Sequence, residues 1–466
     1  NPAASHMINA AVHAMNAFLL YAVLKYLNDR GALFAGLIFA LHPVHVESVA
    51  WISERKNVLS GLFYLLSLYA FLKFEDRPGK GIYILSLVLF VMALLCKTVA
   101  CTLPAAILII RWMRARDIGT GYIARLVPFF ALGLAFGLLT IWWEANLVGA
   151  SGQQWEMSYL DRVLIAGRVF WFYLYKLIAP FELIFIYPRW QIDPSAIWQW
   201  VFPAAAILAA ALVLALSRRI GRGPAASMAF FIVTLFPALG FIDVYPFQFS
   251  FVADHFQYMA SAGPISLFAA AAWTASRGAS YAKTLSAAAI FLVVLWTLSF
   301  SQTFIYKDSD TLWKDTAARN PDAWIAHANL AVASINSDPD AAIAHGEKAY
   351  GMNPSNELIS NALGLAFYRK SKALAQKGME TESQGYNARA IELYAQAIAR
   401  EPRYAAAHIN LGISLGHKED YDGAIEHFQY ALRLNPSKTF VTKNIDLMLE
   451  LKAMTHPLEL EMRGQK

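Results

Sequence analysis

The side chains best suited to chemistry gather in one short segment of the chain, between His42 and Asn57. Imidazoles, carboxylates and cations stand there around a single tryptophan: His42, His45, Glu47, Trp51, Glu54, Arg55 and Lys56. Ionisable residues between apolar runs are costly to bury in a membrane and usually serve a function. The segment is therefore the first place to look for a site.

A metal site is one interpretation of this segment. Two histidines and a glutamate, His42, His45 and Glu47, are residue types that bind zinc. Pro43 interrupts any helix that would align them, and no fourth ligand is evident. Hydrogen bonding within the loop or to a substrate explains the segment better. No cofactor is indicated, although the sequence leaves a divalent metal ion open.

A phosphate site is a second interpretation. Arg55 and Lys56 are adjacent cations, and a guanidinium can hold a phosphate or pyrophosphate through two hydrogen bonds. Contact with lipid headgroups is the simpler alternative. Lys97 lies between two apolar runs, where it either extends to the membrane surface or adds a third cation to the same site.

Two further stretches combine charge with aromatic rings. Tyr187, Arg189 and Trp190 suit a sugar or a phosphate headgroup, or they anchor the chain in the aromatic belt of a membrane. The second stretch places an acid, a histidine and a tyrosine at the start of an apolar run: Asp254, His255 and Tyr258. Asp254 could alternatively cap a helix. Together the loops predict one aromatic, mostly cationic cavity.

The elements around these loops are expected to be membrane helices. The chain is 57% hydrophobic and 15% charged, whereas soluble domains carry about 25% charged residues. Its net charge of +6 does not point to nucleic acid, because the basic residues cluster in short loops between apolar runs. The sequence predicts an all-α fold with about 10–11 spans. These are 7–27, 31–43, 58–73, 82–96, 99–113, 122–142, 161–187, 197–216, 226–241, 257–275 and 284–303.

The basic loops set the expected orientation. Arginine- and lysine-rich connections around Arg30, Arg77, Arg114, Arg219 and Arg277 should face the cytoplasm. The loops 42–57, 142–161, 187–195 and 243–257 then share the opposite side. With this parity, 161–187 must begin and end on that side, and Pro180 interrupts it. A bent re-entrant or interfacial element buried in protein is expected there.

The remainder of the chain is expected to be a soluble repeat array. Pro402 and Pro436 are 34 residues apart, the length of a tetratricopeptide (TPR) unit. Between them, small and large apolar residues stand at the places that such a unit requires: Leu411, Gly412, Ala424, Phe428 and Ala431. Similar units end at Pro402, with a polar insertion at 371–384, and at Pro354. We predict a membrane domain (1–303), a linker (304–321), three units (322–437) and a capping helix with tail (438–466).

A family resemblance rests on these motifs. The run from His42 to Asn57, the Tyr187-Pro188-Arg189-Trp190 sequence, the Ser250–His255 stretch and the membrane-then-TPR order resemble TMTC-like proteins. These transmembrane and TPR-repeat proteins are related to protein O-mannosyltransferases of the GT-C glycosyltransferase superfamily. The resemblance implies a GT-C-like helix bundle followed by a TPR solenoid. It also implies inverting sugar transfer from a polyprenyl-phosphate donor to a protein hydroxyl on the outer or luminal face.

The resemblance further implies roles for individual residues. Arg55, Lys56, Lys97, Arg189 and His255 would bind the donor phosphate, and the TPR units would recruit the acceptor protein on their concave face. The remaining loop residues would line the substrate cavity: His42, His45, Trp51, Glu54, Tyr187, Trp190, Asp254 and Tyr258. The family's acidic base is expected in a loop upstream of Asn1, which leaves Glu47 as a weak substitute. A non-catalytic TPR scaffold in the membrane is the alternative.

The expected location follows from the loop lengths. Short loops and a compact array favour a bacterial inner membrane, with the repeats on the periplasmic or extracellular side, over an endoplasmic reticulum membrane. The expected partners are membrane lipid, the sugar donor and a protein or peptide, with no nucleic acid.

Overall fold

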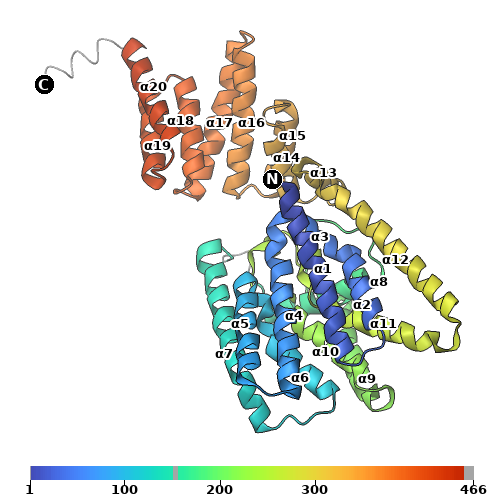
Figure 1. The fold of residues 1–466 in the computed structure, drawn as a ribbon. Coiled ribbons are helices and arrows are strands. Elements are labelled where there is room, and N and C mark those ends of the chain that lie inside the picture. Colours follow the sequence, from blue (N-terminus) through green and yellow to red (C-terminus); the bar gives the residue numbers. More distant parts are fainter. Residues whose placement is uncertain (1, 151–155, 456–466) are drawn as a thin grey trace. The chain divides into compact units, whose positions relative to one another are not determined.

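The computed structural model describes residues 2–150 and 156–455, and the chain divides into two compact units. The first unit is Asn1–Asp308 and the second is Ser309–Lys466. Each consists of helices joined by loops, as shown in Figure 1, which confirms the predicted all-α class.

The long helices of the first unit correspond to the apolar runs of the sequence. They are α1 (Pro2–Tyr26), α2 (Ala32–Leu41), α3 (Val46–Ala50), α4 (Arg55–Asp76), α5 (Lys80–Cys96), α6 (Leu103–Met113), α7 (Thr120–Trp143), α8 (Tyr159–Ile178), α9 (Val201–Ile220), α10 (Gly223–Leu235), α11 (Ala262–Ala275) and α12 (Tyr281–Thr303). Short 3-10 turns connect several of them, including η1 (Pro43–His45), η2 (Ile52–Glu54), η3 (Thr98–Thr102) and η9 (Asp254–Gln257).

Fewer helices meet the length needed to cross a membrane than the 10–11 spans predicted. Within the described residues, five helices are long and apolar enough, and a bent pair at Ala32–Ala50 would make a sixth. The pair is bent by 55° because Pro43 cannot continue α2. Three predicted spans, 82–96, 99–113 and 226–241, are shorter apolar helices. Hydrophobic runs show where the chain is apolar, but turns inside them shorten the helices.

The connections of the first unit lie at two ends of the bundle. The α1–α2, α4–α5, α6–α7 and α9–α10 turns lie together at the lower end in Figure 1. Ion pairs join two of these turns: Arg116 lies 2.7 Å from Asp76, and Arg111 lies 3.2 Å from Glu75. The chemistry-bearing segment between α2 and α4 lies at the other end, so the predicted separation of basic and chemistry-bearing loops holds within this unit.

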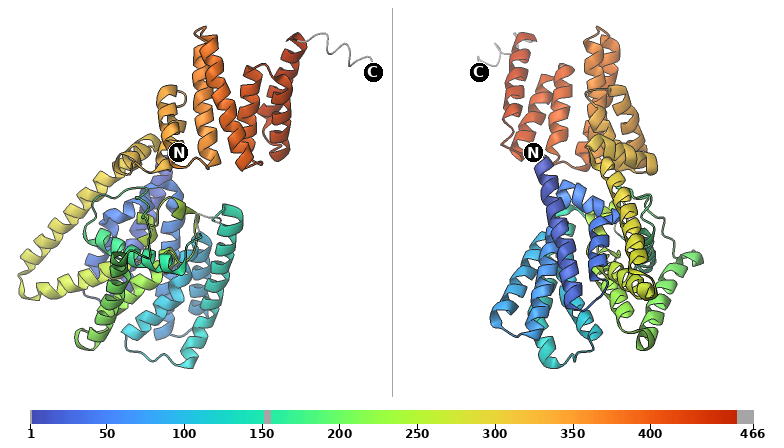
Figure 2. Two further views of the ribbon diagram at one scale, coloured as in Figure 1. Left: turned by 180° about the vertical axis from the view of Figure 1, so that it is seen from behind. Right: turned by 45° about the vertical axis from the view of Figure 1, so that its right-hand side comes forward.

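The segment 161–187 contains the predicted interruption. Helix α8 ends at Ile178, two residues before Pro180, and the chain from there to Ser195 is irregular. The left view of Figure 2 shows α8 lying across the neighbouring helices. The buried Lys176 ammonium donates to the carbonyl oxygens of Phe181 (2.7 Å) and Glu182 (3.1 Å). A buried side chain thus satisfies the broken backbone, as buried irregular segments require.

The second unit is a stack of antiparallel helix pairs. Its helices are α13 (Ser309–Arg319), α14 (Trp324–Ser334), α15 (Pro339–Met352), α16 (Glu357–Ala375), α17 (Glu380–Arg400), α18 (Ala405–His417), α19 (Tyr421–Leu434) and α20 (Thr439–Thr455). The segment 304–321, predicted as a linker, contains the helix α13 and the boundary between the units. The insertion at 371–384 lengthens α16 and α17 to 19 and 21 residues.

Small residues allow the paired helices to approach closely. A Cβ on Gly412 would lie 2.8 Å from the ring of Phe428, and a Cβ on Gly364 would lie 2.8 Å from the ring of Tyr394. Ala424 and Phe428 are fully buried between the helices. The 34-residue pattern therefore reflects the packing of small against large side chains within each pair.

Two histidine pairs occupy equivalent places in the array. They are His327 with His345 (Nδ1 to Nδ1, 3.0 Å) and His408 with His427 (2.9 Å). In the first pair, His327 Nε2 lies 3.1 Å from the Pro321 carbonyl, which only accepts, so this nitrogen carries the hydrogen. His327 Nδ1 must then accept a hydrogen bond from His345 Nδ1. If both rings of the pair were protonated, two Nδ1–H groups would face each other with no acceptor between them.

These pairs predict an array that loses stability in acid. Burial lowers the pKa of all four histidines in the folded state, whereas the unfolded rings titrate near pH 6.5. The unfolded chain therefore binds more protons below that pH, and stability falls as pH falls from 7.5 to 5.5. The unfolding midpoint of the array, measured calorimetrically on the full chain, should drop by several degrees, since about 1 kcal/mol shifts such a midpoint by about 2–4 °C.

A double variant provides the control for this effect. His345→Gln with His427→Gln removes one titrating ring from each pair, so the drop between pH 7.5 and 5.5 should be clearly smaller. An equal drop in the variant and the native chain would show that other groups cause it.

Candidate functional site

The candidate site lies where three distant parts of the chain meet. The η1–α3–η2 segment leads into α4, the η9 turn precedes α11, and Lys97 ends α5. Pro43 turns the chain out of α2, and extended backbone at Trp51 separates α3 from η2. These two breaks hold the polar segment as a compact loop over the end of the bundle.

Glu54 is the most buried charge of the loop, at 1% exposure. Its Oε1 lies 3.1 Å from the Lys56 ammonium, and its Oε2 lies 3.3 Å from the Lys97 ammonium. Burial lowers the pKa of Lys97, and the charge of Glu54 opposes this shift. Lys97 thus lies in the loop cluster with Lys56 and reaches a carboxylate directly.

Glu47 and His255 form the second contact. The backbone N–H of His255 donates to Glu47 Oε2 at 2.9 Å, and its Nδ1 lies 2.9 Å from Glu47 Oε1. A carboxylate at Nδ1 fixes the hydrogen on that nitrogen and leaves Nε2 as the ring nitrogen available to a ligand. The Trp51 ring meets the imidazole edge-on at 5.7 Å. Glu47 and His255 are both buried.

Asp254 and Tyr187 form the third contact. The Tyr187 hydroxyl donates to Asp254 Oδ1 at 3.0 Å, and both residues are buried. Burial, with the nearby charge of Glu47, raises the pKa of Asp254 well above its usual range. Two carboxylates in different surroundings, one held by a histidine and one by a tyrosine, are the kind of pair in which one group can carry a proton while the other is charged.

Asn57 joins these contacts and was not among the predicted site residues. Its amide donates to Ser48 Oγ and to the His255 carbonyl, each at 2.8 Å, and its Oδ1 accepts from Lys97 at 3.1 Å. One side chain therefore ties the loop, the η9 turn and the end of α5 together. A polar residue in the first turn of α4 was its only signal in the sequence.

Phe185 is a second residue that sequence reasoning did not identify. Its ring lies 5.0 Å from Trp51 and 6.2 Å from Tyr306 at the end of α12. It therefore places the irregular segment after α8 beside the site. No pattern in the sequence distinguishes it from the many other phenylalanines.

His42, His45 and Tyr258 lie in a different network. His42 Nε2 is 3.0 Å from the Leu177 carbonyl, and His45 bonds to the Phe39 carbonyl (2.7 Å) and Ser261 Oγ (2.9 Å). The Tyr258 hydroxyl accepts from Asn16 at 2.9 Å. These polar groups tie helices together in the interior. In residues 2–150 and 156–455, no group of three or more histidine, cysteine or carboxylate side chains is arranged to hold a metal ion.

Arg55, Arg189 and Trp190 make contacts outside the Glu54 cluster. Arg55 donates to Asn9 Oδ1 (3.1 Å) and to the Ser5 carbonyl (3.3 Å) at the start of α1. Arg189 stacks over the Phe251 ring at 4.9 Å, and Trp190 lies 6.3 Å from the same ring. Since Phe251 precedes η9, Arg189 and Trp190 flank the site.

Parts of the chain match the models of two known protein families. Residues 3–143 match the family model of dolichyl-phosphate-mannose-protein mannosyltransferases, and residues 306–357 and 377–438 match the tetratricopeptide-repeat model. The chain therefore combines a mannosyltransferase-type membrane segment with TPR repeats. The first match contains Glu47, Glu54 and Lys97.

Individual relatives are distant. The Drosophila melanogaster protein O-mannosyl-transferase Tmtc1 is 34% identical over 103 residues, which cover 22% of this chain and 12% of the relative. Human TMTC2 is 41% identical over 81 residues, covering 17% and 10%. Human TMTC4 is 33% identical over 119 residues, covering 21% and 16%. The matched part is thus a small fraction of each relative's length.

The buried ion contacts predict unequal effects of removing the two lysines. Lys97→Met leaves Glu54 buried without one of its two cations, which should cost near the lower end of about 3–5 kcal/mol of stability. Lys56 is 54% exposed, so Lys56→Met should cost less than about 1 kcal/mol. Chemical unfolding of the two variants in detergent measures the difference.

A compensating variant separates the ion contact from packing. Lys97→Met combined with Glu54→Gln removes both charges and should recover most of the lost stability. If the double variant is as unstable as Lys97→Met alone, the charge of Glu54 is not the cause.

Proposed function

We propose that the protein transfers a sugar from a polyprenyl-phosphate donor to a protein hydroxyl on the non-cytoplasmic face of its membrane. One observation carries the proposal. Paired carboxylates, cations and a fixed imidazole from segments more than 200 residues apart, such as Glu47 and His255, meet at one end of the membrane unit, opposite the arginine-rich turns. The mannosyltransferase-type match over residues 3–143 supports the same reaction class.

The donor phosphate is assigned to the cations around Glu54. Lys56 and Lys97 already contact one anion, the Glu54 carboxylate. In its doubly protonated form, His255 would donate to Glu47 through Nδ1 and to the donor phosphate through Nε2. As the bond between the sugar and the phosphate breaks, its electron pair stays on the phosphate oxygen. Fixed cations stabilise that charge without reorganising.

The proton of the acceptor hydroxyl is assigned to the carboxylate pair. The hydroxyl oxygen attacks the anomeric carbon, and its proton passes to a carboxylate. A carboxylate whose pKa is raised by burial is the stronger base in its ionised form, which favours Asp254. Glu47 is the second choice, because His255 engages both of its oxygens. Trp51, Arg189 and Trp190 would form the aromatic flank against which a sugar can stack.

The acceptor is assigned to the TPR array, since such repeats bind polypeptides. The chain leaves the membrane unit beside the site: Gln302 near the end of α12 donates to the Leu183 carbonyl at 3.1 Å, and Tyr306 meets Phe185. The last residues of the membrane unit thus lie at the end of the bundle that carries the site. A polypeptide recruited by the array would be held on the same chain as the reacting groups, which raises its effective concentration.

Transfer assays on variants test this function. In membranes supplied with labelled polyprenyl-phosphate mannose, Asp254→Asn should lower transfer to protein at least about 100-fold, because it removes the proton acceptor. His255→Gln should lower it by a similar factor. Arg77→Gln, an exposed change at the opposite end of the bundle, is the matched control and should keep native transfer.

Two results would contradict the proposed function. Native transfer in both Asp254→Asn and His255→Gln would remove this site from the reaction. Absence of transfer in the native chain, with binding of polypeptides by the array retained, would favour a membrane scaffold.

A further inference from the structure

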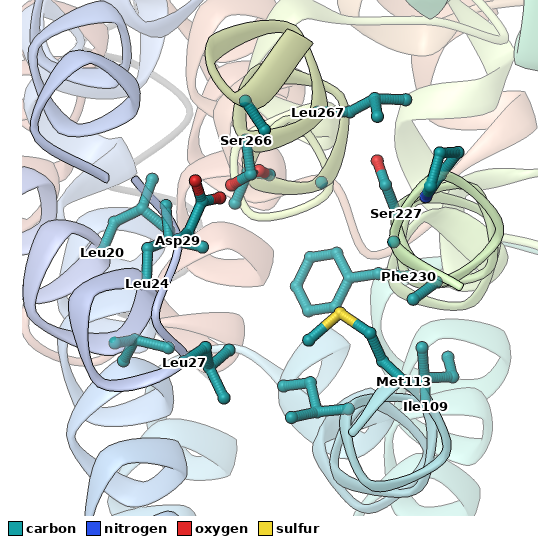
Figure 3. Close-up of a pocket in the computed structure, with 18 of the residues that line it drawn as sticks. Leu20, Leu24, Leu27, Asp29, Ile109, Met113, Ser227, Phe230, Ser266 and Leu267 are labelled. Carbon is teal, nitrogen blue, oxygen red and sulfur yellow. The ribbon is translucent and has the colours of Figure 1, made fainter. Parts of the chain in front are cut away.

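A large cavity lies at the end of the membrane unit that carries the arginine-rich turns. Its volume is about 710 Å³, and residues of α1, α4, α6, α9, α10 and α11 line it. Figure 3 shows Leu20 and Leu24 of α1, with Leu27 just after it, on one side of this space and Ile109, Met113 and Phe230 on the other. Pockets that hold small ligands have volumes of about 300–1,000 Å³, so the cavity is large enough for one.

The lining of the cavity is almost entirely apolar. Leucine, isoleucine, alanine and phenylalanine side chains dominate it, and Asp29 is its one charged residue. Asp29 has a structural role, since its Oδ1 accepts from the Gly31 backbone N–H at 2.7 Å at the start of α2. Ser227 Oγ is buried and has no hydrogen-bond partner in the described residues. Such a space excludes water and accepts hydrocarbon.

Four exposed arginines stand next to lining residues of this cavity in the sequence. Arg30 follows the lining residue Asp29, Arg219 precedes Ile220, Arg222 precedes Gly223, and Arg277 lies two residues beyond Ala275. All four are exposed. Arg30 and Arg277 form no ion pair with a carboxylate within residues 2–150 and 156–455. An apolar chamber with a cationic rim matches a ligand with a hydrocarbon tail and an anionic head.

We infer that this cavity holds one acyl chain of an anionic phospholipid, whose headgroup phosphate contacts the rim arginines. Basic pockets between membrane helices bind such headgroups, and each arginine near the membrane surface adds to the attraction. The inference is independent of the proposed transfer reaction, because the cavity and the candidate site lie at opposite ends of the unit.

The apolar lining of the cavity argues against a protein segment. A polypeptide brings backbone N–H and C=O groups, which would have few hydrogen-bond partners among these side chains. A single acyl chain brings no such groups.

Native mass spectrometry of the full chain tests the inference. The protein is exchanged into detergent with equal amounts of phosphatidylglycerol and phosphatidylcholine. One phosphatidylglycerol should remain bound per chain, in at least about tenfold preference. Arg30→Gln and Arg277→Gln, each made alone, should lower this preference about fivefold, and the double variant should abolish it. The same change at Arg77, at the same end but next to no lining residue, should have no effect.

Substitutions that fill the cavity test whether it holds the acyl chain. Ser227→Phe and Ser266→Phe, on two different helices, should each lower lipid retention about tenfold, whereas Val293→Phe on the exposed face of α12 should not. The arginine variants leave the interior unchanged, so they decide the case if a filled variant fails to fold. Retention of no lipid, equal retention of both lipids, or retention of a polyprenyl phosphate or a peptide in place of phosphatidylglycerol would each overturn the inference.

Discussion

The arrangement of the membrane unit depends on the pairing of charges at its polar end. Glu47 and Glu54 are almost fully buried, and a buried carboxylate without a partner is strongly destabilising. Within the described residues, Glu47 is held by the η9 turn, through the backbone and ring of His255, and Glu54 by lysines that include Lys97 at the end of α5. Pairing therefore requires that the loop, the η9 turn and the end of α5 come together. The same contacts that hold the fold gather these charges at the end of the unit opposite the arginine-rich turns.

The sequence allowed correct predictions where a residue type has a single structural effect. Pro43 and Pro180 had to break helices, and they do. The small residues of the TPR pattern had to face large ones, and Gly412 lies against Phe428. Charged residues at membrane depth had to find partners, which made Glu54 and Lys97 identifiable. These constraints are local or come from burial alone, so they can be recognised without coordinates.

The role of a side chain was harder to predict from the sequence where it depends on which group the side chain contacts. His42 and His45 look like a site in the sequence, yet their ring nitrogens bond to carbonyls and a serine within the core. Arg55 resembles a phosphate ligand, yet it holds the start of α1 through Asn9. Asn57, which joins three segments, was overlooked. A side chain's type limits what it can bind, but only the fold determines which groups lie within reach.

The long helices α16 and α17 have a consequence for the repeat array. They contain 19 and 21 residues, whereas α14 and α18 on either side contain 11 and 13. In Figure 1 this pair stands taller than its neighbours. Most residues of the added turns at 371–384 are exposed. The extra length of the pair therefore extends past the shorter units and leaves side-chain surface of these two helices open to solvent or to a partner.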